Sequence, residues 1–422
     1  MLHFYLGILI FALTLAAIMT RPFRVSEALA AAGGAALMLL FGFLSPGEAL
    51  LLLRGEWNIY GFFLGLMVIA ALADQAGIFE VLAHQTARLA KGSARRLFLG
   101  VFLVGALLTA FLSNDATALI LTPAVYAMVT RLRLSVLPFM FVCTFIADTA
   151  SFLLPVSNPI NILILDSFGS ALGPFLHYLL LPALFCIALN IVAFLFLFRA
   201  DLRQGYSLSD LPPVQSAEPA YFRFTLTALG LIAAAFVLAS IFRIPLSLIA
   251  LGGAAALLVG SRLYRRLDWK RLGGEISWSL FLFISGIFLV IRGVENLGLT
   301  GRVGEWLVKL AGSDPLWATL STAAGSALGA NLINNVPMAL LMVPTLHSVA
   351  STGQAHLGLV YAAVMGCDLG PNLTTVGSLA TMFWLVILRR KGLEVSSIQY
   401  FKLGMLVVPL MVAGGAVLIW LL

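Results

Sequence analysis

Apolar runs of about twenty residues recur along the whole sequence, and no other feature constrains the fold as strongly. Clear examples are residues 2–20, 175–198, 224–242 and 403–422. A helix of this length crosses the hydrocarbon core of a bilayer. Across the chain 61% of the residues are hydrophobic and 10% are charged, whereas a soluble domain has roughly 25% charged residues. The sequence therefore predicts an all-α polytopic membrane protein. The first run lacks a basic leader and a small-residue cleavage site, so we expect it to be a retained span.

The charge and the metal-binding residue types exclude several other classes. The net charge is +7, which in a membrane protein indicates basic residues on the cytoplasmic side, so we expect no nucleic-acid partner. The three cysteines Cys143, Cys186 and Cys367 lie in apolar runs without a CxxC pair. The five histidines show no metal-ligand spacing. We therefore expect no metal, no cofactor and no enzymatic activity.

The basic residues predict the orientation, because Lys and Arg flanking the spans favour the cytoplasmic side. With the N-terminus outside and the spans alternating, all but five of the 25 Lys and Arg residues fall on the cytoplasmic side. The five exceptions are Arg54, Arg243, Arg292, Arg302 and Lys309. The predicted location is the cell (inner) membrane, with both termini on the periplasmic or extracellular side.

Two apolar stretches are too long for one straight span and carry polar residues in the middle. Residues 97–130 contain Ser113-Asn114-Asp115, and residues 315–346 contain Asn331 and Asn334-Asn335. A re-entrant hairpin that turns at the polar tip explains why each stretch is longer than one span. It also keeps the basic residues that follow it in the sequence on the cytoplasmic side, whereas two full spans would reverse their side. Irregular backbone at membrane depth is tolerated where protein or water lines it. Flanking arginines predict that the first hairpin opens inward, and Asp314 and His347 predict that the second opens outward.

The two halves of the chain resemble each other. A shift of 220 residues places Asn114 on Asn334 and Asp148 on Asp368, and a shift of 221 places Gly65 on Gly286. The sequence therefore predicts two inverted repeats, 1–198 and 223–422, joined by a cytoplasmic linker at 199–222. Each repeat is expected to contain five transmembrane spans and one re-entrant hairpin, with broken helices at the midplane. Secondary transporters commonly have this architecture.

A broken helix is predicted after each hairpin, because prolines interrupt both segments. Pro155 and Pro159 follow Asp148, and the pair Gly370-Pro371 follows Asp368. Proline frees backbone groups in the middle of a span, and these groups can line a polar site. Asp115, Asp148 and Asp368 are costly at membrane depth without a cationic partner, and burial favours the protonated form of a carboxyl group. These three acids are the predicted proton-coupling residues. The alternative is that each carboxylate caps a half-helix through backbone N–H groups.

Further polar residues in the same segments are predicted to bind the solute. An uncharged polyhydroxyl solute needs hydrogen-bond donors and acceptors. Alternatively, the asparagines satisfy freed backbone groups, and the hydroxyls bond their own helix carbonyls. The predicted substrate-binding residues are Asn114, Asp115, Thr117, Ser151, Ser157, Asn158, Asn334, Asn335, Thr374, Thr375 and Ser378. The cysteines are expected to be small buried hydrophobes rather than thiolate ligands.

These motifs resemble the ArsB family of arsenite efflux permeases, within the ion transporter superfamily. The resemblance covers nearly the entire chain, and the residues that carry it are 114–115 with 118–123 (ALILTP), 145–151 (FIADTAS), 156–158 (VSN), 334–337 (NNVP), 366–371 (GCDLGP), and 377–381 (GSLAT) with Trp384. Two departures lie beside the predicted site: Asn372 where some relatives have a basic residue, and Ala116 where glycine is expected.

The resemblance implies export of trivalent arsenic and antimony, as the neutral hydroxides As(OH)₃ and Sb(OH)₃, in exchange for protons. It also implies an optional cytoplasmic arsenite ATPase as a partner. Proton loss on the inside would open the site to the cargo. Within the superfamily, a sodium-coupled dicarboxylate carrier or a sodium/proton exchanger stays as an alternative, although Asp115 at the hairpin tip would repel a dianion. A remote alternative is an intramembrane aspartyl protease that uses Asp148 and Asp368.

Overall fold

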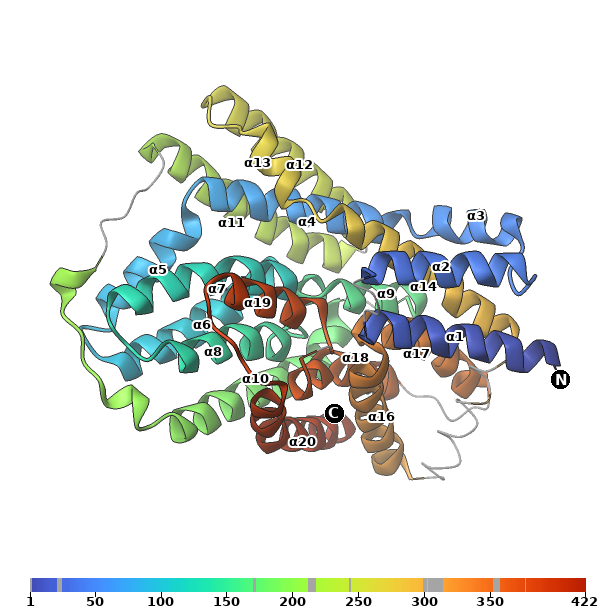
Figure 1. Cartoon of the computed structure of the whole chain (residues 1–422). Helices are drawn as coiled ribbons and strands as arrows, with labels where there is room; N and C mark the ends of the chain where they lie inside the picture. The colour runs from blue at the N-terminus through green and yellow to red at the C-terminus, as the bar shows by residue number, and fades with distance from the viewer. Residues whose placement is uncertain are drawn as a thin grey trace.

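The computed structural model is a bundle of helices (Figure 1). It describes residues 2–20, 25–169, 172–211, 218–242, 244–298, 302, 314–351, 357–375 and 377–422. Arg21, Arg24, Arg243 and Lys309, which entered the topology prediction, lie outside these ranges, as does part of the linker, 212–217. The regular structure of the described residues is helical, apart from an isolated β-bridge between Ser93 and Gly205.

The helices of the first half begin at the N-terminus and end before the linker. They are α1 Leu2–Thr20, α2 Glu27–Leu40, α3 Pro46–Gly55, α4 Trp57–Gln75, α5 Ile78–Leu89, α6 Ala94–Phe111, α7 Asn114–Arg131, α8 Val136–Thr149, α9 Pro159–Ser167 and α10 Leu172–Leu197.

The second half follows the same order of long and interrupted helices. Its helices are α11 Pro219–Phe242, α12 Leu246–Leu263, α13 Trp269–Glu275, α14 Trp278–Asn296, α16 Pro315–Ile333, α17 Asn335–Ser351, α18 Leu357–Leu369, α19 Leu379–Arg390 and α20 Ser397–Leu421.

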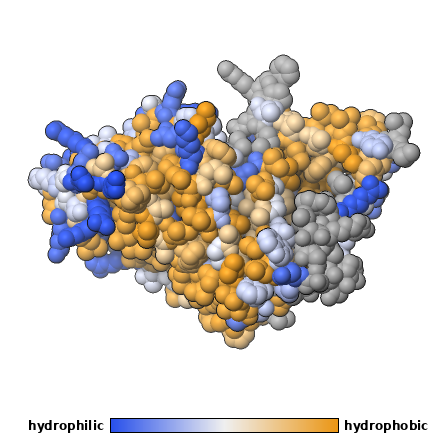
Figure 2. Space-filling view, turned by 90° about the horizontal axis from the view of Figure 1, so that it is seen from below, coloured by the Kyte–Doolittle hydropathy of each residue, from blue (hydrophilic) through white to orange (hydrophobic). Residues whose placement is uncertain are grey.

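The predicted polytopic membrane class is confirmed. Among the described residues, seven helices are long and apolar enough to cross a membrane, and five shorter helices are also apolar. Figure 2 shows hydrophobic side chains over much of one face of the molecule, while hydrophilic side chains gather mainly at its left end. Side chains such as Leu231, Leu263 and Phe196 are more than 60% exposed, which suits a surface surrounded by lipid.

Both predicted hairpins are present as helix–turn–helix units. The first is α6 and α7, which turn at Leu112 and Ser113, and the second is α16 and α17, which turn at Asn334. The tip residues have unusual backbone angles, with φ of 140° at Ser113 and 72° at Asn334. Positive φ at a non-glycine residue costs about 1–3 kcal/mol and is concentrated at functional sites. The two tips therefore lie at corresponding places in the two hairpins, and both have a strained backbone.

Both predicted broken helices are also present. In the first, α8 ends at Thr149, a 3₁₀ turn follows at Pro155–Ser157, and α9 restarts at Pro159. In the second, α18 ends at Leu369, a 3₁₀ turn spans Gly370–Leu373, and α19 restarts at Leu379. Proline without an amide hydrogen suits the first turn of a restarting helix, which explains the position of Pro159.

The helices form two groups. In the first group α4 packs on α12 and α14 packs on α2, with α1 and α11 alongside. The second group contains both hairpins, both interrupted helices, α10 and α20. We expected only the hairpins and interrupted helices to form this core. The structure adds α10 and α20, because α20 packs directly on α10, α16 and α18. In Figure 1, α4, α11 and α12 of the first group lie along the upper edge of the molecule.

Two glycines at repeat-related positions allow close contacts with the backbone of a neighbouring helix in the first group. A methyl group on Gly65 of α4 would lie 2.5 Å from the backbone carbonyl carbon of Ala250 in α12. A methyl group on Gly286 of α14 would lie 2.6 Å from the backbone carbonyl carbon of Ala31 in α2. Small residues let helix backbones approach in this way.

Replacing either glycine by alanine is expected to destabilise the protein by about 1–3 kcal/mol, because the rigid backbone opposite must move. The measurement is the apparent Tm of purified Gly65→Ala and Gly286→Ala proteins in detergent. Gly252→Ala in α12 is the matched control, since a methyl group there meets nothing within 4 Å. Equal Tm values for all three variants would show that the close approach is not required.

Candidate functional site

Four helices restart inside the bundle, and a polar side chain caps each restart. Ser113 Oγ accepts a hydrogen bond from Ala116 N at the start of α7, and Asn158 Oδ1 accepts one from Ile160 N in α9. Asn334 Oδ1 accepts from Val336 N in α17, and Ser378 Oγ accepts from Thr381 N in α19. The capping role that we considered for the three aspartates therefore belongs to serine and asparagine. The restarting N-termini place positive dipole ends inside the bundle.

Asp148 joins three elements of the site. Its Oδ1 accepts a hydrogen bond from Asn114 Nδ2 at the first hairpin tip, at 3.4 Å. Its Oδ2 accepts from Ser378 Oγ and Thr381 Oγ1 of the second interrupted helix, at 3.3 and 3.2 Å. The side chain is 1% exposed. A buried carboxylate with only neutral donors is expensive to keep charged, so this position is suited to holding a proton.

Asp368 occupies the repeat-related position and has a simpler environment. Its Oδ1 accepts a hydrogen bond from Asn158 Nδ2 at 2.6 Å, and Oδ2 is buried without a hydrogen-bond partner among the described residues. Because a buried polar atom normally has a partner, the free oxygen of Asp368 is available to a proton or a bound hydroxyl group.

Asp115 differs from the other two acids because it faces a cavity. The cavity has a volume of about 340 Å³ and extends from Asp115 and Ser113 to Asp74 at the last turn of α4. Its walls are largely apolar and include Phe63, Met67 and Phe383. Among the described residues that line it, the charged ones are all acidic: Asp74, Asp115 and Glu275.

The mouth of this cavity carries an ion-pair network. Arg271 Nη2 lies 2.6 Å from Asp74 Oδ2, and Arg271 Nε lies 2.8 Å from Glu275 Oε1. We call this end of the molecule the inner end; it is also where the first hairpin opens, at the start of α6 and the end of α7. The cavity therefore gives Asp115 a path to the inner end, through a mouth with two carboxylates and one guanidinium group.

The remaining predicted residues are mostly bonded within the site's own backbone. Thr117 Oγ1 donates to Ser113 O, Ser151 Oγ to Asp148 O, and Ser157 Oγ to Ala110 O. Thr374 Oγ1 donates to Asn331 Oδ1, and Thr375 Oγ1 pairs with Ser397 Oγ. Asn335 N donates to Gly377 O, while its buried Oδ1 meets no hydrogen-bond partner in the described part of the chain. These residues hold the hairpin tips and breaks in place.

Sequence reasoning missed several residues that complete the site. Thr381 bonds Asp148 directly and also lies 3.5 Å from Tyr400 Oη. Asn161 Nδ2 donates to Ser151 O. Asn372, which the sequence placed beside the predicted site without a partner, donates from Nδ2 to Thr149 Oγ1. A general signal was present, since each is a polar residue in an otherwise apolar run. Their partners come from distant parts of the chain, which a pattern along the sequence does not reveal.

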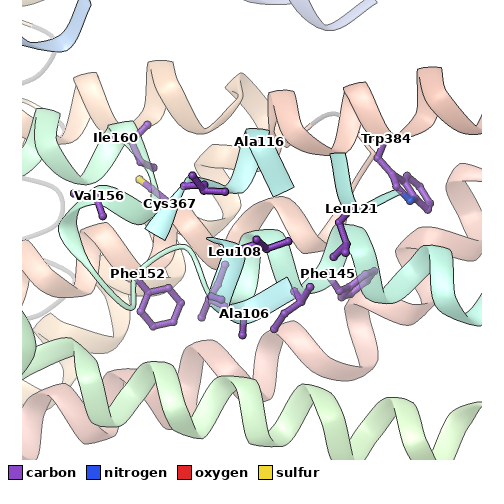
Figure 3. Close-up of a cluster of buried hydrophobic side chains, with 14 of the residues drawn as sticks. Ala106, Leu108, Ala116, Leu121, Phe145, Phe152, Val156, Ile160, Cys367 and Trp384 are labelled. Atoms are coloured by element: carbon purple, nitrogen blue, oxygen red, sulfur yellow. The ribbon is translucent and has the colours of Figure 1, made fainter. Parts of the chain in front are cut away.

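The cysteines lie in the hydrophobic core. Cys143, Cys186 and Cys367 are each 0% exposed. Figure 3 shows Cys367 within a cluster of apolar side chains that includes Ile160 and Val156. A buried thiol among apolar groups stays protonated and inert, since the thiolate is the metal-binding form. Within the described ranges, the three cysteines thus form no thiolate site.

Replacing all three cysteines by alanine is therefore expected to keep at least half of the transport rate. Stability should fall by about 1 kcal/mol per site, because each replacement removes one buried sulfur atom. The measurement is uptake by vesicles of arsenite, the cargo that the family resemblance implies, normalised to the protein present. A drop of tenfold or more in a folded protein would place a thiol in the transport path.

Solved structures share the arrangement of the helices. The structure of the YdaH transporter from Alcanivorax borkumensis, described as having an unusual topology, superposes with a TM-score of 0.63 at 15% sequence identity. The match covers 100% of this chain and 97% of that chain. At this identity the likeness establishes the fold alone. Together with the apolar helices, it defines a multi-pass membrane protein with two hairpins and two interrupted helices.

Sequence relatives identify the family. The model of the family described as "Arsenical pump membrane protein" (ArsB) matches residues 6–421. An arsenical pump membrane protein of Escherichia coli strain K12 is 34% identical over 403 residues, covering 94% of each chain. A relative in Yersinia enterocolitica with the same description is 33% identical, and a 46 kDa membrane protein of Mycobacterium leprae is 26% identical, each over 94% of both chains. The chain belongs to the arsenical pump membrane protein family. Its named relatives are membrane pumps or transporters rather than enzymes.

Proposed function

We propose that the protein exports trivalent arsenite and antimonite, as the neutral hydroxides As(OH)₃ and Sb(OH)₃, in exchange for protons. The relatives named as arsenical pumps support an arsenical cargo. The proposed location is the inner membrane, with both termini on the periplasmic side. In this topology the inner end of the molecule faces the cytoplasm, where an arsenite ATPase would be an optional partner.

The observation that carries this proposal is the lining of the inner cavity. The charged residues of its lining are Asp74, Asp115 and Glu275, and its walls are largely apolar. Arg271 pairs with Asp74 and Glu275 at the mouth, so this network of two carboxylates and one guanidinium group keeps a net negative charge. In a weakly solvated cavity, carboxylates repel anions strongly because charge interactions grow as the dielectric constant falls. A neutral hydroxide enters without this penalty and can donate hydrogen bonds to a carboxylate. The lining thus favours a neutral cargo and protons over a dicarboxylate.

The acids have distinct roles in the proposed cycle. Asp115, in contact with the cavity, exchanges its proton with the cytoplasm and then accepts hydrogen bonds from the cargo. Asp148 and Asp368, held by Asn114 and Asn158, adjust their protonation as the core moves. The moving core is the second helix group, and the first group is the scaffold. Each group contains helices from both proposed inverted repeats, 1–198 and 223–422, which the linker at 199–222 connects.

Everted membrane vesicles test this proposal. With the interior acid, arsenite uptake is measured by mass detection, with and without a protonophore, beside vesicles that lack the protein. Uptake that depends on the protein and collapses with the protonophore supports proton-coupled export. Sealed vesicles that contain the protein and take up no arsenite would contradict the proposal.

Sodium coupling is the alternative that the acidic cavity also suits, because carboxylates attract any small cation. The same vesicles distinguish it when a sodium gradient replaces the proton gradient. Uptake driven by sodium and insensitive to the protonophore would assign the coupling to sodium ions.

A further inference from the structure

The two helix groups meet at a polar contact at the outer end of the molecule, opposite the inner cavity. Asn58, at the start of α4, donates a hydrogen bond from Nδ2 to Asp166 Oδ2 in the last turn of α9, at 2.6 Å. The other side of the same amide is held by the scaffold, because Ser247 N of α12 donates to Asn58 Oδ1 at 3.3 Å. Asn58 therefore connects the scaffold helices α4 and α12 to the core helix α9.

The corresponding positions of the second half lie at the inner end and are separated by open space. Shifted by 221 residues, Asn58 corresponds to Ser279 at the start of α14; shifted by 220, Asp166 corresponds to Val386 in α19. Ser279 and Val386 both line a second cavity of about 130 Å³, which shares Ser277, Leu280 and Phe383 with the cavity of Asp115. The hydrogen bond between Asn58 and Asp166 is thus made at the outer end, while the corresponding pair at the inner end, Ser279 and Val386, lines a cavity.

We propose that Asn58 and Asp166 form the outer latch of the transporter, and that the latch opens when the core closes the inner gap between Ser279 and Val386. The inference rests on the proposed alternating movement of the core against the scaffold. In the structure described here the latch is closed and Asp115 faces the inner cavity, so this is the inward-facing arrangement. Export requires the cargo to leave at the outer end, and α9 cannot move away from α4 while this hydrogen bond holds.

The chemistry of the latch suits a contact that must break in every cycle. A hydrogen bond to a carboxylate is stronger than one between neutral groups, but its net contribution in a solvent-accessible place is modest. Asp166 is exposed and Asn58 is half-buried, so water replaces each partner when the latch opens. The free-energy difference between the closed and the open latch is therefore small enough for a proton gradient to shift the equilibrium.

The experiment uses three pairs of cysteines in the full-length protein without Cys143, Cys186 and Cys367, treated with a short bifunctional methanethiosulfonate. The outer pair is Asn58→Cys with Asp166→Cys, and the inner pair is Ser279→Cys with Val386→Cys. The control pair is Tyr60→Cys with Ser285→Cys, which joins α4 to α14 within the scaffold, where Tyr60 Oη and Ser285 Oγ lie 3.0 Å apart. Cross-linking is read from the loss of sites for maleimide-polyethylene glycol on a gel, and arsenite uptake is measured on the same vesicles.

The outer pair is expected to cross-link at least fivefold faster than the inner pair in resting vesicles. Its cross-link should lower uptake at least tenfold, with recovery on reduction, while the cross-linked control pair keeps at least half of its uptake. Adding Asn58→Ala to the inner pair should raise its cross-linking rate about tenfold, the shift expected for the loss of one hydrogen bond to a charged group. Size-exclusion profiles confirm that each variant is folded.

Two results would overturn the latch. One is unchanged uptake by the fully cross-linked outer pair, and the other is an inner-pair cross-linking rate that Asn58→Ala does not alter. Failure of the proposed function looks different: the protein without cross-links then takes up no arsenite. Because the cross-linking rates need no cargo, they still report whether the outer and inner contacts alternate.

Discussion

Asp115→Asn protein is expected to let arsenite equilibrate across the membrane but not to accumulate it. One pH unit is worth 1.36 kcal/mol per proton, so each coupled proton supports roughly tenfold accumulation per pH unit. Asparagine keeps the shape and hydrogen-bonding capacity of the side chain but carries no exchangeable acidic proton. Accumulation in everted vesicles should therefore fall to a ratio of about one. The measurement is the steady-state ratio of arsenite inside and outside at several imposed pH gradients.

Asp74→Asn is the matched control, because Asp74 lines the same cavity but lies at its mouth beside Arg271. This variant should keep the dependence of accumulation on the pH gradient. Asp115→Glu should restore part of the coupling, since it returns a carboxyl group one methylene further from the backbone. An Asp115→Asn protein that still accumulates arsenite against a gradient would remove Asp115 from the proton pathway.

Asp148→Ala is expected to reduce both stability and transport. Asn114, Ser378 and Thr381 all donate to this carboxylate, and its loss leaves these buried donors without their acceptor. The free energy of unfolding should fall by about 3 kcal/mol, given the usual cost of unsatisfied buried groups. Uptake should fall to the level of vesicles without the protein. Stability is measured as the apparent Tm in detergent and by chemical denaturation.

Asp148→Asn separates the structural role from proton handling. Its amide oxygen can still accept from Asn114, while its NH₂ group can donate to the hydroxyls of Ser378 and Thr381, which rotate to accept. Stability should therefore fall by about 1 kcal/mol or less, yet the side chain no longer binds a proton. Loss of uptake in this folded variant would assign Asp148 to coupling. Full uptake by Asp148→Asn, together with the unstable Asp148→Ala, would leave Asp148 with only a structural role. Thr381→Val, which removes one donor and keeps the shape, should reproduce part of the stability loss.

Much of the fold was predictable because membrane helices obey a strong local rule. Lipid cannot satisfy backbone polar groups, so each apolar run must form a helix, and polar residues in such a run mark a turn or a break. The hairpin tips at Ser113 and Asn334 and the breaks after Asp148 and Asp368 followed from this rule. The inverted relation of the two halves stays a prediction, although Gly65 and Gly286 make equivalent close contacts with different helices.

Most residues of the site were predictable from the sequence, but the hydrogen bonds between them were not. The sequence indicated the aspartates and most of the asparagines, because polar residues are rare in apolar runs. It did not reveal that Ser378 and Thr381 bond Asp148 from more than 200 residues away, or that Ser113 rather than an aspartate caps α7. Nor did it show that Asp115 faces a cavity while Asp148 and Asp368 lie inside the bundle.

The sequence by itself therefore determined the membrane class, the positions of the turns and breaks, and the acids at their ends. Each of these depends on interactions between a residue and its solvent or near neighbours along the chain. Only the tertiary structure decided which helices form the two groups, where the cavity opens, and that Asn58 reaches Asp166. These features depend on side chains brought together from distant segments. Packing geometry decides such contacts, and hydropathy along the chain carries no information about them.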